Sequence, residues 1–334
     1  QPDRLVSDGK ILAGVFERPP RDSSLLEADL FQGGARGAWH RKRLMEWFGY
    51  GLRTPDWYLG AIIIDAKFLP IASVYLVNRR DQTSFSHDLV AGRVKIARNP
   101  WDDRTWAKGP GYSVEFVHHL DAGRNEIIID VAMPRKPRVR GRITLTEDLV
   151  EMPALSAVVP TVPPHFFYTH KACMPAGGEL EIGGEKITLD PGRDLAILDE
   201  HRHYAQAPAI WTWGTAGGHD EKGRFLAFNL GDTGGLDQER WNENCLWVEN
   251  RLELLGPVVW TLDRKKTKKP WTVKDKAGRV DLTFTPQNGK DVNLPPLGRY
   301  FQMSGHYRGF VVGAAGEKRM VEDFYGCAEN GHVG

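Results

Sequence analysis

The sequence predicts an all-β protein with two linked antiparallel halves and little helix. Short apolar or alternating runs recur between turn signals, while strong helical periodicity is scarce. Glycine and proline are frequent, at 36 and 21 of 334 residues, which fits many short strands joined by tight turns. A proline-rich stretch separates two β-rich regions and marks the join between the halves.

The first half, residues 1–150, begins with an irregular lead-in over residues 1–38. Residues 40–53 suit either one short helix or a basic and aromatic strand, and the pattern leaves both open. Strands are predicted at Trp57–Asp65, a near-continuous apolar run, and at Tyr112–His119, which alternates between two faces. Further strands are expected at Ile71–Val77, Glu126–Met133 and Arg138–Thr146.

Residues 151–164 (EMPALSAVVPTVPP) contain four prolines and are predicted to form a semi-rigid connection. The second half, residues 165–334, contains the clearest hairpin, because Gly183-Gly184 supplies the positive φ angles of a tight primed turn. A short echo, GRITLT at 141–146 and GRVDLT at 278–283, is what a tandem repeat would leave. The remaining strands are expected at Arg224–Leu230, Leu246–Leu254, Val258–Leu262, Val280–Thr285, Phe301–Ser304 and Tyr307–Val312.

The composition excludes several classes of partner. Lys plus Arg (44) nearly equal Asp plus Glu (43), so no overall field favours nucleic acid or an acidic membrane. No apolar run reaches the roughly 18 residues of a membrane helix, and no secretory signal is visible. The chain starts at Gln1 without Met, so we expect that a leader or tag was removed. Three widely spaced cysteines fit buried thiols in a cytoplasmic protein: Cys173, Cys245 and Cys327.

Residues 165–218 concentrate chemically active side chains, and four of the eleven histidines lie there: His165, His170, His201 and His203. Tyr168 and His170 are two residues apart and therefore share one strand face, opposite Lys171. Such a pair can act as acid and base, because histidine titrates near neutral pH. The alternative is a buried strand whose polar tips bond to the backbone.

Asp199, His201 and His203 also alternate onto one strand face. One carboxylate and two imidazoles could hold zinc or non-haem iron. The alternative is a polar strand end or the wall of a pocket. Because no spacing elsewhere completes a metal site, we expect no metal and no cofactor.

Trp211 and Trp213 share a face and could form a platform for a sugar ring or a wall against a polyene, although such pairs more often belong to a core. Glu243 and Asn244 form a polar insert in an aromatic region. A buried carboxylate there would suit a general acid. The alternative is a loop residue that caps a turn.

Several segments, taken in order, resemble the bacterial domain of unknown function 2804 over nearly the whole chain. They include Thr54-Pro55-Asp56-Trp57-Tyr58-Leu59, Phe167-Tyr168-Thr169-His170-Lys171, Trp211-x-Trp213-Gly214 and the run from Gly278 to Pro286. Asp199 matches the Asp of that family's Leu-Asp pair, and Arg202 matches the basic position after it, whereas His201 and His203 depart from the pattern. The family is distantly similar to tandem lipocalin-like proteins such as carotenoid hydratases and fungal pericyclases.

This resemblance implies two linked lipocalin-like barrels with a ligand cavity in or between them, although a shared fold defines no reaction. We predict an acid/base enzyme, a hydratase-type lyase or an isomerase, that hydrates, eliminates or isomerises an apolar or cyclic small molecule. The alternatives are a non-catalytic carrier of a lipid or isoprenoid, and a protein that binds or cleaves carbohydrate on a tryptophan platform. No dinucleotide, P-loop or serine-hydrolase motif is present.

The predicted site lies in the second half. His170 is the expected base, Tyr168 the acid or orienting donor, and Asp199 the group that orients a partner. Glu243 is a further catalytic candidate. The candidates for substrate binding are Lys171, Arg202, Trp211, Trp213 and Asn244.

Overall fold

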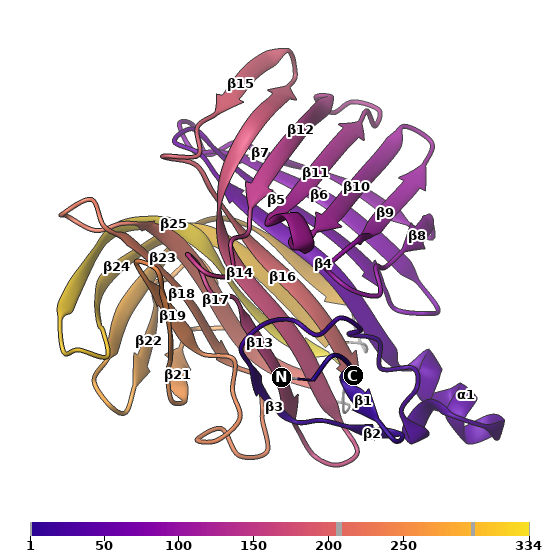
Figure 1. Ribbon diagram of the computed structural model, residues 1–334. Coiled ribbons are helices and arrows are strands. Elements are labelled where there is room, and N and C mark those ends of the chain that lie inside the picture. Colours follow the sequence, from indigo (N-terminus) through magenta and orange to yellow (C-terminus); the bar gives the residue numbers. More distant parts are fainter. Residues whose placement is uncertain (1, 205–208, 295–297, 334) are drawn as a thin grey trace. The chain divides into compact units, whose positions relative to one another are not determined.

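The computed structural model describes residues 2–204, 209–294 and 298–333 of the chain. The chain divides into two compact units, each with its own curled sheet and core. Unit 1 comprises Gln1–Val158 and Phe167–Ala205, and unit 2 comprises Val159–Phe166 and Gln206–Gly334. Both are almost entirely antiparallel β, which confirms the predicted fold class (Figure 1).

The main sheet of unit 1 runs in the order β7-β6-β5-β4-β16-β14-β12-β11-β10-β9-β8 (Figure 1). β8 and β9 lie close to β5 and β6, so the sheet curls back over its own apolar face. The strands are β4 (Leu44–Arg53), β5 (Trp57–Asp65), β6 (Pro70–Asn78), β7 (Ser84–Val90), β8 (Arg93–Lys95), β9 (Asp103–Gly109), β10 (Tyr112–His119), β11 (Arg124–Val131), β12 (Val139–Thr146), β14 (Phe166–Ile182) and β16 (Leu195–Tyr204).

Smaller elements surround this sheet. β13 pairs with β14 and β3, β15 pairs with β14, and β1 pairs with β2. None of the helices in the described part of the chain is long and apolar enough to cross a membrane. The elements are β1 (Val6–Ser7), β2 (Lys10–Ile11), β3 (Gly14–Phe16), η1 (Asp29–Phe31), α1 (Gly34–Lys42), η2 (Leu120–Ala122), β13 (Leu155–Pro160) and β15 (Glu185–Leu189).

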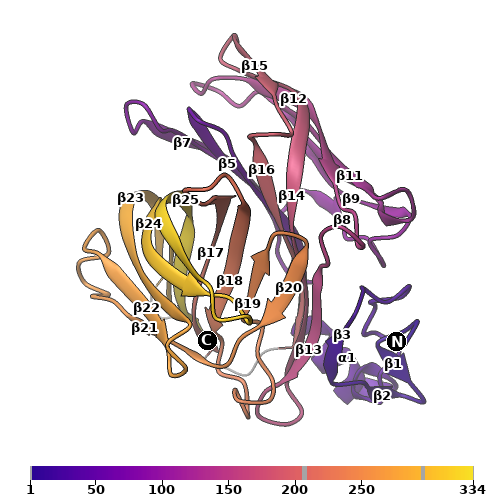
Figure 2. The ribbon, with the colours of Figure 1, turned by 60° about the vertical axis from the view of Figure 1, so that its left-hand side comes forward.

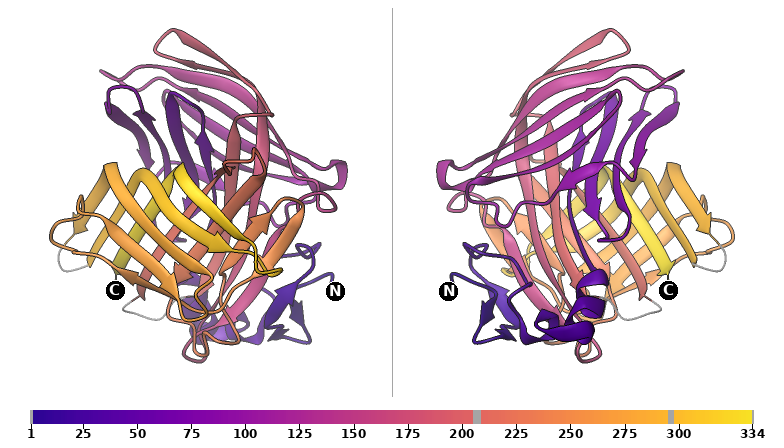
Figure 3. Two further views of the ribbon diagram at one scale, coloured as in Figure 1. Left: turned by 90° about the vertical axis from the view of Figure 1, so that its left-hand side faces the viewer. Right: turned by 90° about the vertical axis from the view of Figure 1, so that its right-hand side faces the viewer.

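The sheet of unit 2 runs in the order β20-β19-β18-β17-β25-β24-β23-β22-β21. Figures 2 and 3 show its curl, and β18 approaches β21 where the sheet bends round. The strands are β17 (Ala209–His219), β18 (Phe225–Asp232), β19 (Cys245–Val248), β20 (Arg251–Leu254), β21 (Val258–Thr261), β22 (Trp271–Asp275), β23 (Val280–Leu294), β24 (Gly298–Val312) and β25 (Lys318–Val333).

Period-two alternation selects the buried face of each central strand in unit 1. On β4 the even positions, such as Phe48, Tyr50 and Leu52, belong to the apolar core. On β14 and β16 the even positions again point to this core, as Ala172 and Leu198 do. We call this core the interior of unit 1. A polar residue at an even position of these strands is therefore placed among apolar neighbours.

The structure differs from the sequence-based expectations in three places. Residues 40–53 form both elements that the pattern left open, the end of α1 and then β4. The proline-rich stretch 151–164 contains β13, so part of it is a strand. Residues 167–205 belong to unit 1 and not to the C-terminal half, because β14 and β16 pair with β12 and β4 of the first half.

The Gly183-Gly184 hairpin between β14 and β15 is present, with Ile182 opposite Glu185 and φ angles of 60° and 95° at the two glycines. We expect Gly184→Ala to lower the free energy of unfolding by about 1 kcal/mol, because an L-residue is strained at this φ. Urea denaturation measures the loss. Gly60→Ala is the matched control, since Gly60 is on β5 with no positive φ and an added Cβ there has ordinary contacts. Equal effects of the two changes would contradict the strain argument.

Candidate functional site

His170 on β14 lies in the interior of unit 1 with a carboxylate at each ring nitrogen. Its Nε2 is 2.8 Å from Glu147 Oε1, and its Nδ1 is 3.1 Å from Glu200 Oε2. Glu147 directly follows β12, and Glu200 is on β16, so three neighbouring strands meet at this imidazole. All three side chains are at most 1% exposed. The arrangement is a dry carboxylate–imidazole–carboxylate triad.

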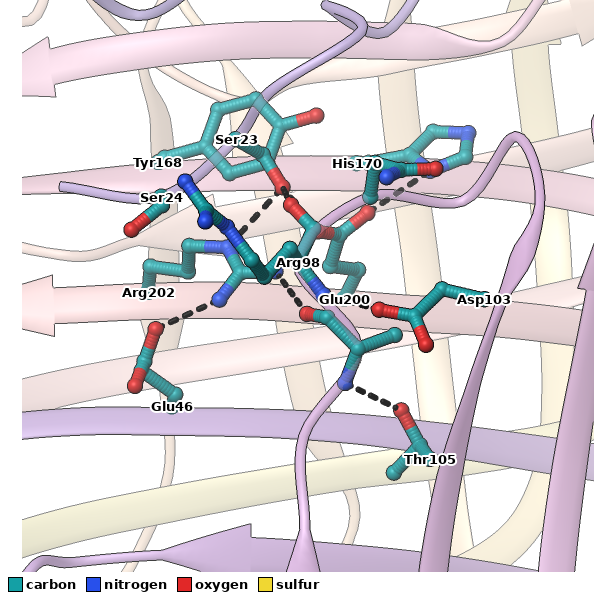
Figure 4. Close-up of polar contacts among 12 residues, drawn as sticks. Ser23, Ser24, Glu46, Arg98, Asp103, Thr105, Tyr168, His170, Glu200 and Arg202 are labelled. Atoms are coloured by element: carbon teal, nitrogen blue, oxygen red, sulfur yellow. Dashed lines mark hydrogen bonds and ion pairs between the residues drawn. The ribbon is translucent and has the colours of Figure 1, made fainter.

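Arg202 extends the triad along β16 (Figure 4). Its Nη2 donates to Glu200 Oε1 at 3.2 Å and to the Ala97 carbonyl at 2.6 Å, and its Nε donates to Ser23 Oγ at 3.0 Å. Its Nη1 donates to Glu46 Oε1 at 2.5 Å. Arg202 was predicted to hold a ligand, but its nitrogens are engaged within unit 1. It therefore positions Glu200 by charge and hydrogen bonding.

The acids and bases of this network are paired with one another. Burial alone would lower the pKa of His170, but Glu147 and Glu200 outweigh it and raise the pKa to about 9. Burial raises the pKa of Glu200, but the His170 hydrogen bond and the Arg202 charge outweigh it and lower the pKa. Lys67 pairs with Glu46 at 2.5 Å. His170, Arg202 and Lys67 thus face four carboxylates, those of Glu147, Glu200, Glu46 and Asp65, and His170 is an imidazolium at neutral pH.

A second layer of neutral groups fixes Glu147. Asn125 Nδ2 donates to Glu147 Oε2 at 2.5 Å, and Asn125 Oδ1 lies 3.3 Å from His118 Nδ1. The other His118 nitrogen is 3.3 Å from Thr105 Oγ1. Burial lowers the pKa of His118 to about 4, so this second histidine is neutral and carries no charge into the interior.

Two tyrosines border the triad. Tyr168, on β14, is fully buried, and its hydroxyl lies 3.5 Å from Ser156 Oγ. The hydroxyl of Tyr50, on β4, is buried and has no hydrogen-bond partner among the described residues. Burial first, and then the charges of Glu147 and Glu200, raise the pKa of Tyr50 well above its ordinary value. Tyr50 is therefore a protonated phenol whose pKa responds to the charge of both carboxylates, and its hydroxyl has no hydrogen-bond partner among the described residues.

The odd positions of β14 and β16 lie on the opposite face from His170. There Lys171 Nζ pairs with Asp199 Oδ1, and Trp47 Nε1 donates to Asp199 Oδ2 at 3.1 Å. His201 stacks on Trp47, with ring centroids 4.3 Å apart and planes 3° apart. Lys171 and Asp199 are therefore separated from His170 by the sheet itself.

The alternative metal ligands Asp199, His201 and His203 do share this face, as strand geometry predicts. However, Asp199 is engaged by Lys171, and His201 is stacked between Trp47 and Phe167. Burial, then the charges of His203 and Lys171, lower the pKa of His201 well below its ordinary value. Over residues 2–204, 209–294 and 298–333, no group of three or more His, Cys, Asp or Glu side chains could hold a metal ion.

The remaining predicted residues lie in unit 2. Trp211 Nε1 donates to Glu329 Oε1 at 2.8 Å, and Trp213 Nε1 donates to Asn229 Oδ1 at 2.8 Å. Trp213 is 6% exposed, so it offers no open platform. The predicted residues of β14 and β16 thus belong to unit 1, whereas β17 belongs to the sheet of unit 2. The expected single cluster does not form within one unit.

Glu243 and Asn244 precede β19, and hydrogen bonds join this segment to neighbouring segments of unit 2. Asn244 Oδ1 accepts from the Gly231 N–H at 2.5 Å, and its Nδ2 donates to the Gly256 carbonyl at 3.2 Å. The Glu243 carbonyl accepts from Asn229 Nδ2 at 2.7 Å. The Asn244 side chain thus ties a turn to β18, which matches the structural alternative for Asn244, whereas the Glu243 side chain is buried, with 2% of the residue exposed.

Sequence and structure comparisons agree with this architecture. The chain shares 14% identity with a candidate AttH protein of Nitrosomonas europaea, over 87% of this chain and 93% of that one, with a TM-score of 0.52. It shares 12% identity with kievitone hydratase of Nectria haematococca, over 86% and 88% of the two chains, with a TM-score of 0.53. At these identities the likeness concerns the fold alone.

The comparison with curated proteins found no significant relative. The family described as "Domain of unknown function (DUF2804)" matches residues 1–333. The match spans the whole sheet order of both units and confirms the resemblance seen in the sequence. This chain therefore belongs to the DUF2804 family.

Proposed function

We propose that this protein is an acid/base enzyme, a hydratase-type lyase or an isomerase, and that its proton-transfer groups lie in the interior of unit 1. The observation that carries the proposal is the buried His170, with Glu147 and Glu200 on its two nitrogens, together with the Tyr50 hydroxyl, which lies in the same core and has no hydrogen-bond partner among the described residues. Charged groups in a dry core are costly to bury, and such clusters are concentrated at functional sites.

The protonation states assign the roles. His170 was predicted as the base, but its raised pKa makes it a proton donor or relay at neutral pH. Glu147 and Glu200 are the groups that can accept a proton, and Tyr50 is the phenol that can donate one. Hydration, elimination and isomerisation each move a proton to or from carbon, so a donor and an acceptor in the same interior suit all three.

The surroundings favour an apolar or cyclic substrate. Phe48, Phe116, Ala172 and Met174 belong to the apolar core that surrounds the triad. In such a medium, fixed charges act more strongly on a reacting group than they do in water. Kievitone hydratase shares the fold and is by its name a hydratase, which makes a hydratase-type reaction the first to test.

A non-catalytic carrier of a lipid or isoprenoid is the second candidate. It is favoured by one observation: both nitrogens of His170 are already bonded within the protein, as in a structural ion network. The carbohydrate alternative is weaker, because Trp213 is buried. The three free cysteines are buried, which supports the proposal that the protein works in the reducing cytoplasm.

We expect Tyr50→Phe to lower turnover by about a hundredfold or more, because general acid catalysis contributes at least that much. The protein is incubated with neutral cyclic alkenes, enones and alcohols in heavy water, and mass spectrometry follows deuterium at carbon and gain or loss of water. The thermal midpoint should stay unchanged, since the Tyr50 hydroxyl has no hydrogen-bond partner to lose.

Tyr307→Phe in unit 2 is the matched control for this experiment. Its hydroxyl donates to the Cys327 carbonyl at 2.7 Å, so the change costs stability while turnover should persist. Full activity of Tyr50→Phe on any substrate that the protein turns over would remove Tyr50 from the mechanism. Tight retention of a ligand with no exchange at carbon would favour the carrier.

The raised pKa of His170 also makes stability depend on pH. Its pKa is about 9 in the folded chain against an ordinary value of 6.5, so its contribution is complete below pH 6.5 and is lost as pH rises to 9. From pH 6.5 to 9 we expect the free energy of unfolding to fall by about 3 kcal/mol from this group. Urea denaturation at the two pH values measures the fall.

Glu147→Gln provides the comparison for the pH experiment. It removes one of the two carboxylates that raise the pKa of His170, so the fall between the two pH values should be smaller than in the unaltered chain. Groups elsewhere titrate alike in both proteins and cancel in the difference. Identical pH dependence would mean that His170 is not held as an imidazolium by Glu147.

A further inference from the structure

Four polar atoms in the interior of unit 1 have no hydrogen-bond partner among the residues that the structure describes. They are the hydroxyls of Tyr50 and Tyr112, Nε1 of Trp57 and Nδ1 of His87. Their residues are 3%, 3%, 7% and 0% exposed. Buried polar atoms are nearly always paired, so four unpaired ones in one core need a common explanation. We call these residues the unpaired set.

Strand register places two members in one row of the sheet. Tyr50 is opposite Ala61, Ala61 is opposite Val74, and Val74 is opposite His87. Residues in such a row project from the same face of the sheet. Tyr50 and His87 therefore point into the same interior, with the small Ala61 and Val74 between them.

The other two members reach the same interior from β5 and β10. Trp57 shares the face of Ala61, four residues away on β5, and belongs to the same core. Tyr112 shares the face of Phe116 on β10, and the Phe116 ring meets Tyr50 edge-on at 4.9 Å. β10 therefore faces β4 across the interior, and all four members of the unpaired set project from inward faces of this sheet.

Each unpaired atom demands a particular partner. Trp57 Nε1 can only donate, so it needs an oxygen acceptor. His87 Nε2 is 2.8 Å from the Pro137 carbonyl, which places the ring proton on Nε2. Burial lowers the pKa of His87, so the ring is neutral and Nδ1 can only accept. Protonated Tyr50 and Tyr112 supply further donors. A single hydroxyl oxygen accepts at most two hydrogen bonds, so three donors and one acceptor favour a ligand with both a hydroxyl and a second oxygen.

The interior also favours an uncharged ligand. None of the four unpaired groups is charged, and the neighbouring cations Lys67, His170 and Arg202 are each paired with a carboxylate. An anion placed there would lack a counter-charge in a medium of low dielectric. Small alanines of the same core face this interior, among them Ala61, Ala72, Ala107, Ala172 and Ala196.

We propose that the interior of unit 1 binds an uncharged, mainly apolar ring compound that carries both a hydroxyl group and a carbonyl or ether oxygen. His87 Nδ1 accepts from the hydroxyl, and Trp57 and Tyr112 donate to the other oxygen. This inference rests on the proposed function only in taking the ligand of unit 1 as its substrate.

Matched probes test this specificity by isothermal titration calorimetry on the full chain. A hydroxytetralone carries both groups, tetralone lacks the hydroxyl, tetralin lacks both, and a hydroxynaphthoate adds a negative charge. We expect hydroxytetralone to bind best, with about a threefold to tenfold loss for each missing hydrogen bond and no measurable binding of the anion. Equal binding of all probes, or binding of none, overturns the proposal.

Two variants assign the contacts. His87→Phe removes the ring acceptor together with the bond to the Pro137 carbonyl, so it should bind hydroxytetralone and tetralone equally. Tyr112→Phe should weaken both ketones about threefold to tenfold without lowering the thermal midpoint, because its hydroxyl has no partner to lose. Tyr307→Phe, the control, should lower the midpoint by about 2–4 °C and leave probe binding unchanged.

The outcomes separate this inference from the acid/base assignment. If Tyr112→Phe lowers the midpoint as Tyr307→Phe does and leaves affinity unchanged, the unpaired atoms bind buried water only, and the proposal fails. If the chain turns over a substrate but does not discriminate among the probes, the acid/base assignment stands and the recognition by the unpaired set is wrong. If the probes bind in the expected order but no exchange at carbon occurs, the protein is a carrier with this specificity.

Discussion

The imidazole of His170, with a carboxylate at each ring nitrogen, fixes the register of three neighbouring strands in unit 1. Glu147 follows β12, His170 is on β14 and Glu200 is on β16, so a slip of any one strand would leave a buried charge without its partner. Removing one member of a buried ion pair costs about 3–5 kcal/mol, far more than a surface pair contributes. Arg202, Glu46 and Ser23 continue the same constraint to β4 and the N-terminal segment.

Much of the fold could be read from the sequence, because local patterns determine most strands. The apolar run of β5, the alternation of β10 and the Gly183-Gly184 turn each indicate their own conformation. Pairing between distant strands leaves no such local trace. For that reason the sequence did not indicate that residues 167–205 complete the first sheet, nor that β25 is a single long strand.

Part of the candidate site could also be predicted from the sequence. Tyr168, His170 and Arg202 stood out by residue type, and alternation placed the first two on one face. The same period-two alternation places Glu200 on the face of Arg202. It also places Glu147 on the inward face that continues β12, so both carboxylates could have been identified from the sequence. Nothing in the sequence indicates that the Tyr50 hydroxyl has no hydrogen-bond partner among the described residues. That property depends on which side chains the strands across the interior place near it. Residue type also grouped Trp211 and Glu243, which belong to unit 2, with residues of unit 1.

The sheet order of unit 1 has a consequence for folding on the ribosome. β4–β7 and β8–β12 each form a meander of chain neighbours, but β14 and β16, made later, lie between β4 and β12. Until they are synthesised, the nascent chain exposes the strand edges of β4 and β12, which are prone to pair with other chains. Ser23 and Arg202, 179 positions apart, can bond only after that insertion. The polar network of unit 1 can therefore close only once β14 and β16 are in place, and the insertion of these strands covers the two edges.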